Sequence, residues 1–189
     1  MCIRDRSRVA AVALPDRDRE LLYYLAMYKL AGLSVPGGPA ATLQGPWVEE
    51  YCLPPWQCDY HFNINVQECY WPVFGGNYIP ALEPLWEMVR SWEPRLRENA
   101  RIFAGVEDGL PLPHAVDDRC TCMGGFWTGS IDHGSTAWTG QLRWMQWRYT
   151  MDERFLRDTA YPFMKGAMRV YEAMLEDVEA VAGELHIPV

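Results

Sequence analysis

Polar side chains with catalytic potential occupy every second position from His61 to Asn65, within residues 54–65 (PPWQCDYHFNIN). If this stretch is extended, His61, Asn63 and Asn65 lie on one side and the apolar residues between them anchor the other. An amide oxygen accepts a hydrogen bond from water while its NH2 group donates to a hydroxyl. Two such amides could orient a water molecule against a polyhydroxylated substrate, and Trp56 offers a flat face for a sugar ring. The alternative is that the asparagines cap turns and the tryptophan belongs to the core.

A second group of ionisable side chains lies in residues 112–119 (LPHAVDDR). An imidazole, two adjacent carboxylates and a guanidinium (His114, Asp117, Asp118 and Arg119) could supply an acid with a shifted pKa. The alternative is a surface Asp–Arg pair with a turn. Asp132 directly precedes a predicted helix, and we expect it to act as the N-cap of that helix.

The sequence disfavours several other kinds of site. His114, Cys120, Cys122 and His133 lack the spacing of a zinc site, so we expect neither a metal nor another cofactor. No Gly-x-Ser-x-Gly motif and no phosphate-binding glycine loop occur. The net charge of -8, without a basic stripe, argues against nucleic acid as a partner. No apolar run reaches transmembrane length, so we expect no membrane partner either.

Helices separated by two long loops must position these side chains. Apolar residues at three- and four-residue spacing, together with capping signals, predict helices at 16–33, 82–104, 135–151, 153–160 and from Pro162 onward. Asp16 or Asp18 can cap the first helix, and Pro94 can kink or split the second. Residues 40–80 and 105–134 are predicted to be long ordered loops, which usually carry function.

The predicted helices carry apolar stripes that should face a common core. In the first helix this stripe comprises Leu21, Tyr24, Leu25 and Tyr28, and in the second helix it extends to Phe103. The pattern indicates a mainly α fold, a helical toroid whose long functional loops gather at one end and form a cleft. A complete double ring needs about twelve helices, so this chain would be under half of one.

Blocks of uncommon residues follow one another along the chain. The first are 43–47 (LQGPW), 54–56 (PPW), 60–67 (YHFNINVQ), 70–72 (YWP) and 83–85 (EPL). Later blocks are 137–138 (AW), 155–157 (FLR), 161–162 (YP) and 165–167 (KGA). In order and spacing they resemble the catalytic domain of glycoside hydrolase family 95.

This resemblance implies an incomplete (α/α)6 barrel, with residues 7–189 as the N-terminal part of the catalytic domain. Members of the family are inverting exo-α-L-fucosidases, so the expected partner is a carbohydrate with a terminal sugar. The family's two water-orienting asparagines match Asn63 and Asn65, and the aspartate that they assist is expected beyond residue 189. His61, His114 and Asp117 match substrate-contacting positions.

One departure from the family pattern affects the chemistry. The family's general acid is a glutamate in the helix that follows the AW block, and Met145 occupies the matching position. Methionine cannot donate a proton, whereas an inverting mechanism needs two carboxyl groups about 6.5–9.5 Å apart. Asp117, Asp118 and Asp132 are candidate replacement acids. The alternatives are a non-catalytic carbohydrate-binding relative, another α-L-glycosidase such as an α-L-galactosidase, or an unrelated toroidal polysaccharide lyase.

The first residues, MCIRDR, resemble the translation of a sequencing adapter and lack the apolar segment of a signal peptide. We therefore expect residues 1–6 to be an artefact of a metagenomic fragment whose natural N-terminus is missing. The family resemblance is compatible with a secreted or periplasmic location.

Overall fold

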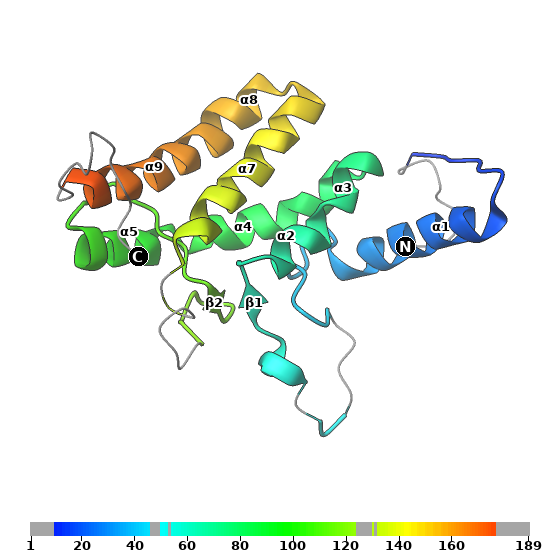
Figure 1. Ribbon diagram of the computed structural model, residues 1–189, viewed down its shortest axis with the longest axis horizontal. Coiled ribbons are helices and arrows are strands. Elements are labelled where there is room, and N and C mark those ends of the chain that lie inside the picture. Colours follow the sequence, from blue (N-terminus) through cyan, green and yellow to red (C-terminus); the bar gives the residue numbers. More distant parts are fainter. Residues whose placement is uncertain (1–9, 46–49, 53, 124–129, 131, 177–189) are drawn as a thin grey trace, which may run out of the picture.

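The computed structural model describes residues 10–45, 50–52, 54–123, 130 and 132–176, which form a mainly helical molecule (Figure 1). The first helices are α1 (Arg17–Leu33), α2 (Asn65–Tyr70), α3 (Pro72–Gly75), α4 (Glu83–Ser91) and α5 (Glu93–Ala104). They are followed by α7 (His133–Thr150), α8 (Glu153–Phe155), the π-helical η4 (Leu156–Ala160) and α9 (Tyr161–Glu176). The predicted mainly α fold is confirmed. The expected artefact at residues 1–6 and the Pro46-Trp47 part of the first block lie outside the described residues.

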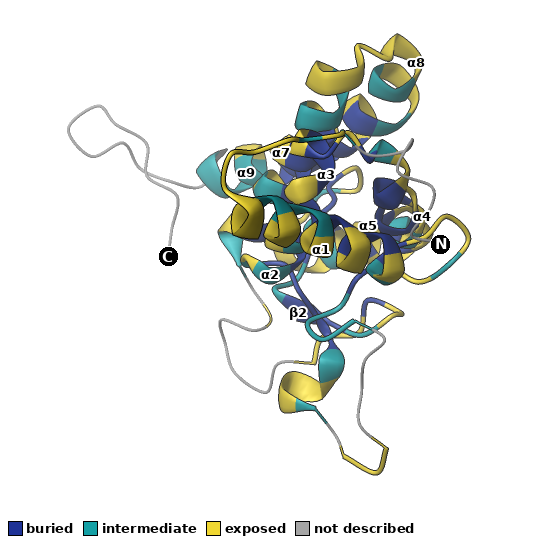
Figure 2. Ribbon diagram, turned by 90° about the vertical axis from the view of Figure 1, so that its right-hand side faces the viewer, coloured by how far each residue is buried: buried dark blue, intermediate teal, exposed yellow. Residues whose placement is uncertain are grey.

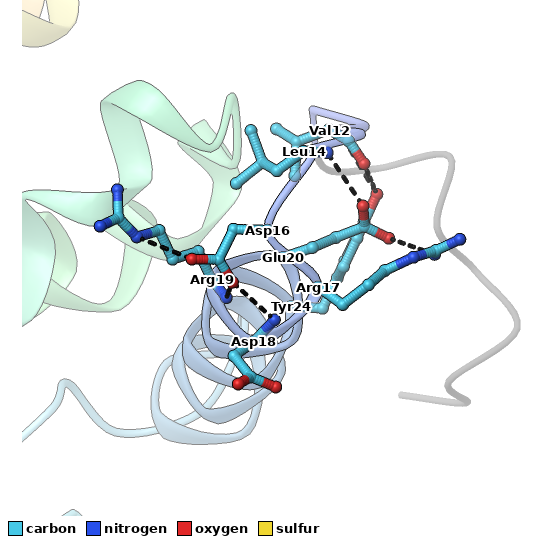
Figure 3. Close-up of polar contacts among 8 residues, drawn as sticks. All are labelled: Val12, Leu14, Asp16, Arg17, Asp18, Arg19, Glu20 and Tyr24. Carbon is cyan, nitrogen blue, oxygen red and sulfur yellow. Dashed lines mark hydrogen bonds and ion pairs between the residues drawn. The ribbon is translucent and has the colours of Figure 1, made fainter.

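Side-chain contacts fix the start of α1 (Figure 3). Oδ1 of Asp16 accepts hydrogen bonds from the N–H groups of Asp18 and Arg19 at 3.0 and 3.2 Å. Oε2 of Glu20 accepts the N–H of Leu14 at 2.9 Å. Of the two predicted capping residues, Asp16 is therefore the one that begins the helix.

The stripe of α1 that was expected to face the core faces outward instead (Figure 2). Leu21 is 66% exposed, and Leu25 and Tyr28 are also exposed, whereas Met27 and Leu30 are buried. The buried side of α1 packs against the end of α3, where any side chain at Gly76 would overlap Met27. Helical spacing was predicted correctly, but the choice of buried face was wrong because it depends on the neighbouring element.

The region 40–80 was predicted to be a long loop, yet much of it forms short helices. The single turns η2 (Pro55–Cys58) and η3 (Ile79–Leu82) flank α2 and α3, and α3 begins with Pro72 in its first turn. The buried hydroxyl of Tyr70 accepts the N–H of Ala41 at 2.9 Å, and burial raises the pKa of Tyr70 to about 12. Helices this short lack a full apolar period, which is why the prediction missed them.

The second predicted helix is split into α4 and α5 at Trp92, as Pro94 indicated. Leu85, Val89 and Leu96 on this pair are fully buried in the core. Phe103, expected on the same side, is 44% exposed because the last turn of α5 borders an open cavity.

The helices α7 and α9 form a hairpin through α8 and η4 (Figure 1). The predicted fourth and fifth helices form one nearly continuous stretch from Glu153 to Glu176, because η4 joins them. Any continuation of the predicted fifth helix beyond Glu176 lies outside the described residues. Among the helices described, none combines the length and apolarity that crossing a membrane requires.

Arg143 on α7 is buried without a carboxylate at ion-pair distance among the described residues. Its guanidinium carbon lies 4.6 Å from the ring centre of Trp86 and 4.3 Å from that of Phe163. Nη1 donates a hydrogen bond to the carbonyl of Thr159 at 3.1 Å. Burial lowers the pKa of Arg143 to about 9, so this environment disfavours the charged form.

Replacing Arg143 with methionine is expected to raise the free energy of unfolding at pH 7 by about 1–3 kcal/mol, because a buried charge without a carboxylate partner is removed. The pKa of Arg143 is lower in the folded state, so the destabilisation is present below pH 9 and is relieved above it. Denaturant unfolding measures the change, with exposed Arg148→Met as the matched control. A clear loss of stability would show that the aromatic contacts outweigh the cost of the buried charge.

Candidate active site

A short antiparallel ladder brings the two predicted functional loops together. In it, β1 (Tyr60–His61) pairs with β2 (Ala115–Val116), with His61 opposite Ala115. The N–H of Phe62 also donates to the carbonyl of His114 at 2.7 Å. The ladder therefore places His61 beside the second group of ionisable residues, and Figure 1 shows both strands below the helices.

The extended polar strip predicted from His61 to Asn65 is wrong beyond its first residue. The chain turns over residues 62–64, and Asn65 is the first residue of α2. The buried side chain of Gln67 holds this turn, because its Nε2 donates to the carbonyl of Phe62 at 2.6 Å. Asn63 lies in the turn, and its buried Oδ1 accepts no hydrogen bond from the described residues.

The ring of His61 lies at the centre of a cluster of predicted site residues. Its Nε2 is 2.8 Å from Oδ1 of Asp59, and both side chains are buried. The rings of Trp56 and His114 each meet it edge to face, with ring centres 5.5 Å apart. Nδ1 of His114 in turn lies 3.1 Å from Oδ2 of Asp132. Trp56 is 63% exposed, so its ring is open to a ligand rather than part of the core.

The sequence reasoning missed Asp59. Burial raises the pKa of this carboxyl, and the neighbouring His61 opposes the rise. Asp59 and His61 are two positions apart on an extended segment, which places them on the same side. The alternation of polar side chains therefore begins at Asp59, two residues before His61, and this signal could have identified Asp59.

The paired aspartates Asp117 and Asp118 are not among the residues in contact with His61. Oδ1 of Asp117 accepts the N–H groups of Arg119 and Thr121 at 2.9 and 2.7 Å, which makes it part of a turn. Although partial burial opposes them, these hydrogen bonds lower the pKa of Asp117. A carboxyl with a lowered pKa is a poor proton donor near neutral pH. Asp118 is exposed, and its backbone carbonyl accepts the indole N–H of Trp92 at 3.0 Å.

Asp132 is the N-cap of α7, as expected. Its Oδ1 accepts the N–H groups of Gly134 and Ser135 at 2.7 and 3.1 Å. Its second oxygen faces His114, so one carboxylate begins the helix and also contacts the histidine cluster.

Met145 lies between three and four turns along α7 from this cap. The side chain is partly buried and packs against the hydrophobic core. It is flanked by Trp144 and by Gln146, whose Oε1 accepts the indole N–H of Trp86 at 2.6 Å. No proton-donating carboxyl therefore occupies this position of the helix.

An apolar cavity of about 290 Å³ borders the other side of Asp132. Its walls come from α5, α7, α9 and the segment between α5 and β2, and include Phe103, Leu112, Thr136 and Val170. His61, Asn63 and Asn65 are not among its lining residues, whereas Asp132 is. Among the described side chains, no group of three or more His, Cys, Asp or Glu could hold a metal ion.

Comparison with known proteins identifies related sequences over most of the chain. The model of the glycosyl hydrolase family 95 catalytic domain matches residues 5–187. "Probable alpha-fucosidase A" of Aspergillus niger is 32% identical over 161 residues, covering 82% of this chain and 20% of the relative. "Alpha-L-fucosidase 2" of Arabidopsis thaliana is 32% identical over 157 residues, covering 78% and 17%. The chain thus spans about a fifth of the length of these curated relatives.

Proposed function

The chain belongs to glycosyl hydrolase family 95, and we therefore propose that the whole protein hydrolyses terminal α-L-fucosyl residues of glycans. Its helices are part of the (α/α)6 barrel of that family's catalytic domain. The observation that carries the proposal is the match over almost the entire chain, together with two relatives that are both named as fucosidases.

We propose an inverting reaction in which Asn63 and Asn65 orient the attacking water. Inversion requires a base that activates water on one face of the sugar and an acid that protonates the leaving oxygen on the other. The buried and unpartnered Oδ1 of Asn63 supports this role, because such an oxygen can accept a hydrogen bond from the water. The family resemblance implies that an aspartate outside this chain acts as the base.

Substrate contacts are proposed for the residues around the histidine cluster. Trp56 is exposed and next to His61, so its ring can stack on the apolar face of a sugar. His61 and His114 can hydrogen bond to sugar hydroxyls. Asp117 is also proposed as a substrate contact, and one of its oxygens already accepts two backbone N–H groups.

A non-catalytic carbohydrate-binding protein is the second candidate function. Met145 favours it, because the position matching the family's acid has no proton to donate. The candidate replacement Asp117 accepts backbone hydrogen bonds, which lower its pKa and so stabilise the ionised form against partial burial. Asp132 is engaged as the N-cap of α7. The third candidate, Asp118, is exposed, and its backbone carbonyl accepts a hydrogen bond from the indole N–H of Trp92.

Assays of the full-length protein distinguish these functions. A hydrolase should release the aglycone from an aryl α-L-fucoside, and NMR should show β-L-fucose as the first product of inversion. If the protein binds L-fucose but releases no aglycone, the hydrolase function is excluded and the carbohydrate-binding function is supported. If the aglycone is released faster from an aryl α-L-galactoside than from the aryl α-L-fucoside, the protein is an α-L-galactosidase. If the protein neither binds nor cleaves these sugars, the proposal fails.

A further inference from the structure

Two carboxylate–imidazole pairs face each other where β1 meets β2. Asp59 contacts His61 at 2.8 Å, and Asp132 contacts His114 at 3.1 Å. The two rings are edge to face, at an interplanar angle of 79°. The four residues come from two loops and a helix cap, so only the tertiary structure brings them together.

Each carboxylate selects the ring nitrogen that carries a proton. A neutral imidazole has one N–H donor and one acceptor nitrogen. An acceptor nitrogen at 2.8 or 3.1 Å from a carboxylate oxygen would place two lone pairs against each other. The two close contacts therefore favour a proton on Nε2 of His61, although that nitrogen and Oδ1 of Asp59 do not have the geometry of a hydrogen bond, and a proton on Nδ1 of His114. The second form is the one that free histidine disfavours.

Neither carboxylate contact is needed to hold the local fold. The backbone ladder and the bond from Phe62 N–H to the His114 carbonyl already join the two loops. Oδ1 of Asp132 caps α7 by itself, which leaves Oδ2 for the imidazole. Burying Asp59 is unfavourable, as its raised pKa indicates, so its position calls for another explanation.

We propose that Asp59 and Asp132 are positioning residues, which fix the donor and acceptor pattern that His61 and His114 present to a bound sugar. This inference rests on the proposed carbohydrate function. A carboxylate partner sets both the tautomer and the orientation of a histidine ring, and loss of such a partner weakens the interactions of that ring.

Imidazole tautomers in the 189-residue chain test the proposal directly. Long-range 15N–1H correlation spectra at pH 8 resolve the protonated nitrogen of each of the four histidines. His114→Gln and His61→Gln variants assign the signals. We expect His114 in the Nδ1–H form and His61 in the Nε2–H form. A His114 ring in the Nε2–H form would overturn the proposal without requiring any carboxylate variant to fold.

An Asp132→Asn variant separates positioning from capping. Asparagine is as good an N-cap as aspartate, so α7 should keep its start. The amide can then place its NH2 group towards His114, which should switch that ring to the Nε2–H form. Asp152→Asn is the matched control, because Asp152 caps α8 through Arg154 and Phe155. A folded Asp132→Asn chain with an unchanged His114 tautomer would contradict the proposal.

Calorimetric titration of the full-length protein with L-fucose supplies the binding test. We expect Asp132→Asn to raise the Kd about tenfold, which corresponds to about 1.4 kcal/mol, and Asp152→Asn to leave it unchanged. A switched tautomer with an unchanged Kd would overturn the positioning role. If the unsubstituted protein does not bind L-fucose, the proposed function fails. The NMR measurement of the His61 and His114 tautomers still tests whether the two carboxylates determine which ring nitrogen is protonated.

Discussion

Replacing Met145 with glutamate in the full-length protein is expected to raise the rate of α-L-fucoside hydrolysis by about 10²–10⁴-fold. The substitution places a proton donor at the position where the family resemblance implies the general acid. Met145 is partly buried against the core, and burial raises the pKa of a carboxyl, as an acid catalyst requires. The measurement is kcat for a fucosyl disaccharide and for a nitrophenyl α-L-fucoside.

The two substrates and a matched variant make this prediction specific. A sugar leaving group needs protonation more than nitrophenol does, so the gain should be larger for the disaccharide. Met145→Gln has nearly the same shape as Met145→Glu but no acidic proton, and it should give no gain. If Met145→Glu still binds L-fucose but remains as slow as the unsubstituted protein, position 145 does not reach the leaving oxygen.

Replacing Phe62 with alanine is expected to lower the free energy of unfolding of the 189-residue chain by about 3–5 kcal/mol. The ring of Phe62 is fully buried and meets Trp92 edge to face, with ring centres 5.9 Å apart. Phe62 is flanked in the sequence by His61 and Asn63, so its removal leaves a cavity beside these two site residues. Denaturant unfolding followed by tryptophan fluorescence measures the change.

Phe103→Ala is the matched control for Phe62→Ala. Phe103 is 44% exposed at the end of α5, so its removal should change the stability by no more than about 1 kcal/mol. Equal losses for the two variants would show that the Phe62 ring is not an anchor of the core. In the Phe62→Ala chain we also expect the His61 and His114 imidazole signals to broaden, because the turn that holds them is loosened.

The helices could be predicted where apolar residues recur at helical spacing over several turns and where a capping residue or proline marks the end. Asp16, Asp132 and Pro94 act locally, through hydrogen bonds or backbone geometry within a few residues. The buried face of α1 could not be predicted, because Leu21 and Met27 are both apolar and differ in whether a neighbouring element covers them. The spacing of apolar residues defines a stripe, whereas the contact with α3 decides whether the stripe is covered.

The sequence identified several residues of the candidate site, but it did not predict how they are arranged in space. Trp56, His61 and His114 were selected by residue type and family pattern, and the structure places their rings together. The turn after His61 was missed because it depends on Gln67 reaching back to the carbonyl of Phe62. Local sequence contains no sign of that bond, or of the pairing between the two loops.

The pairing of β1 with β2 has a consequence for the order of folding. The segment that it closes contains α2, α3, α4 and α5, and closing so long a loop loses chain entropy before any contact compensates for it. We expect the helices to pack first and the ladder to form late. The histidine cluster would then be absent from partly folded chains that already have a core. A sugar bound across the two strands would favour the last folding step and slow its reversal.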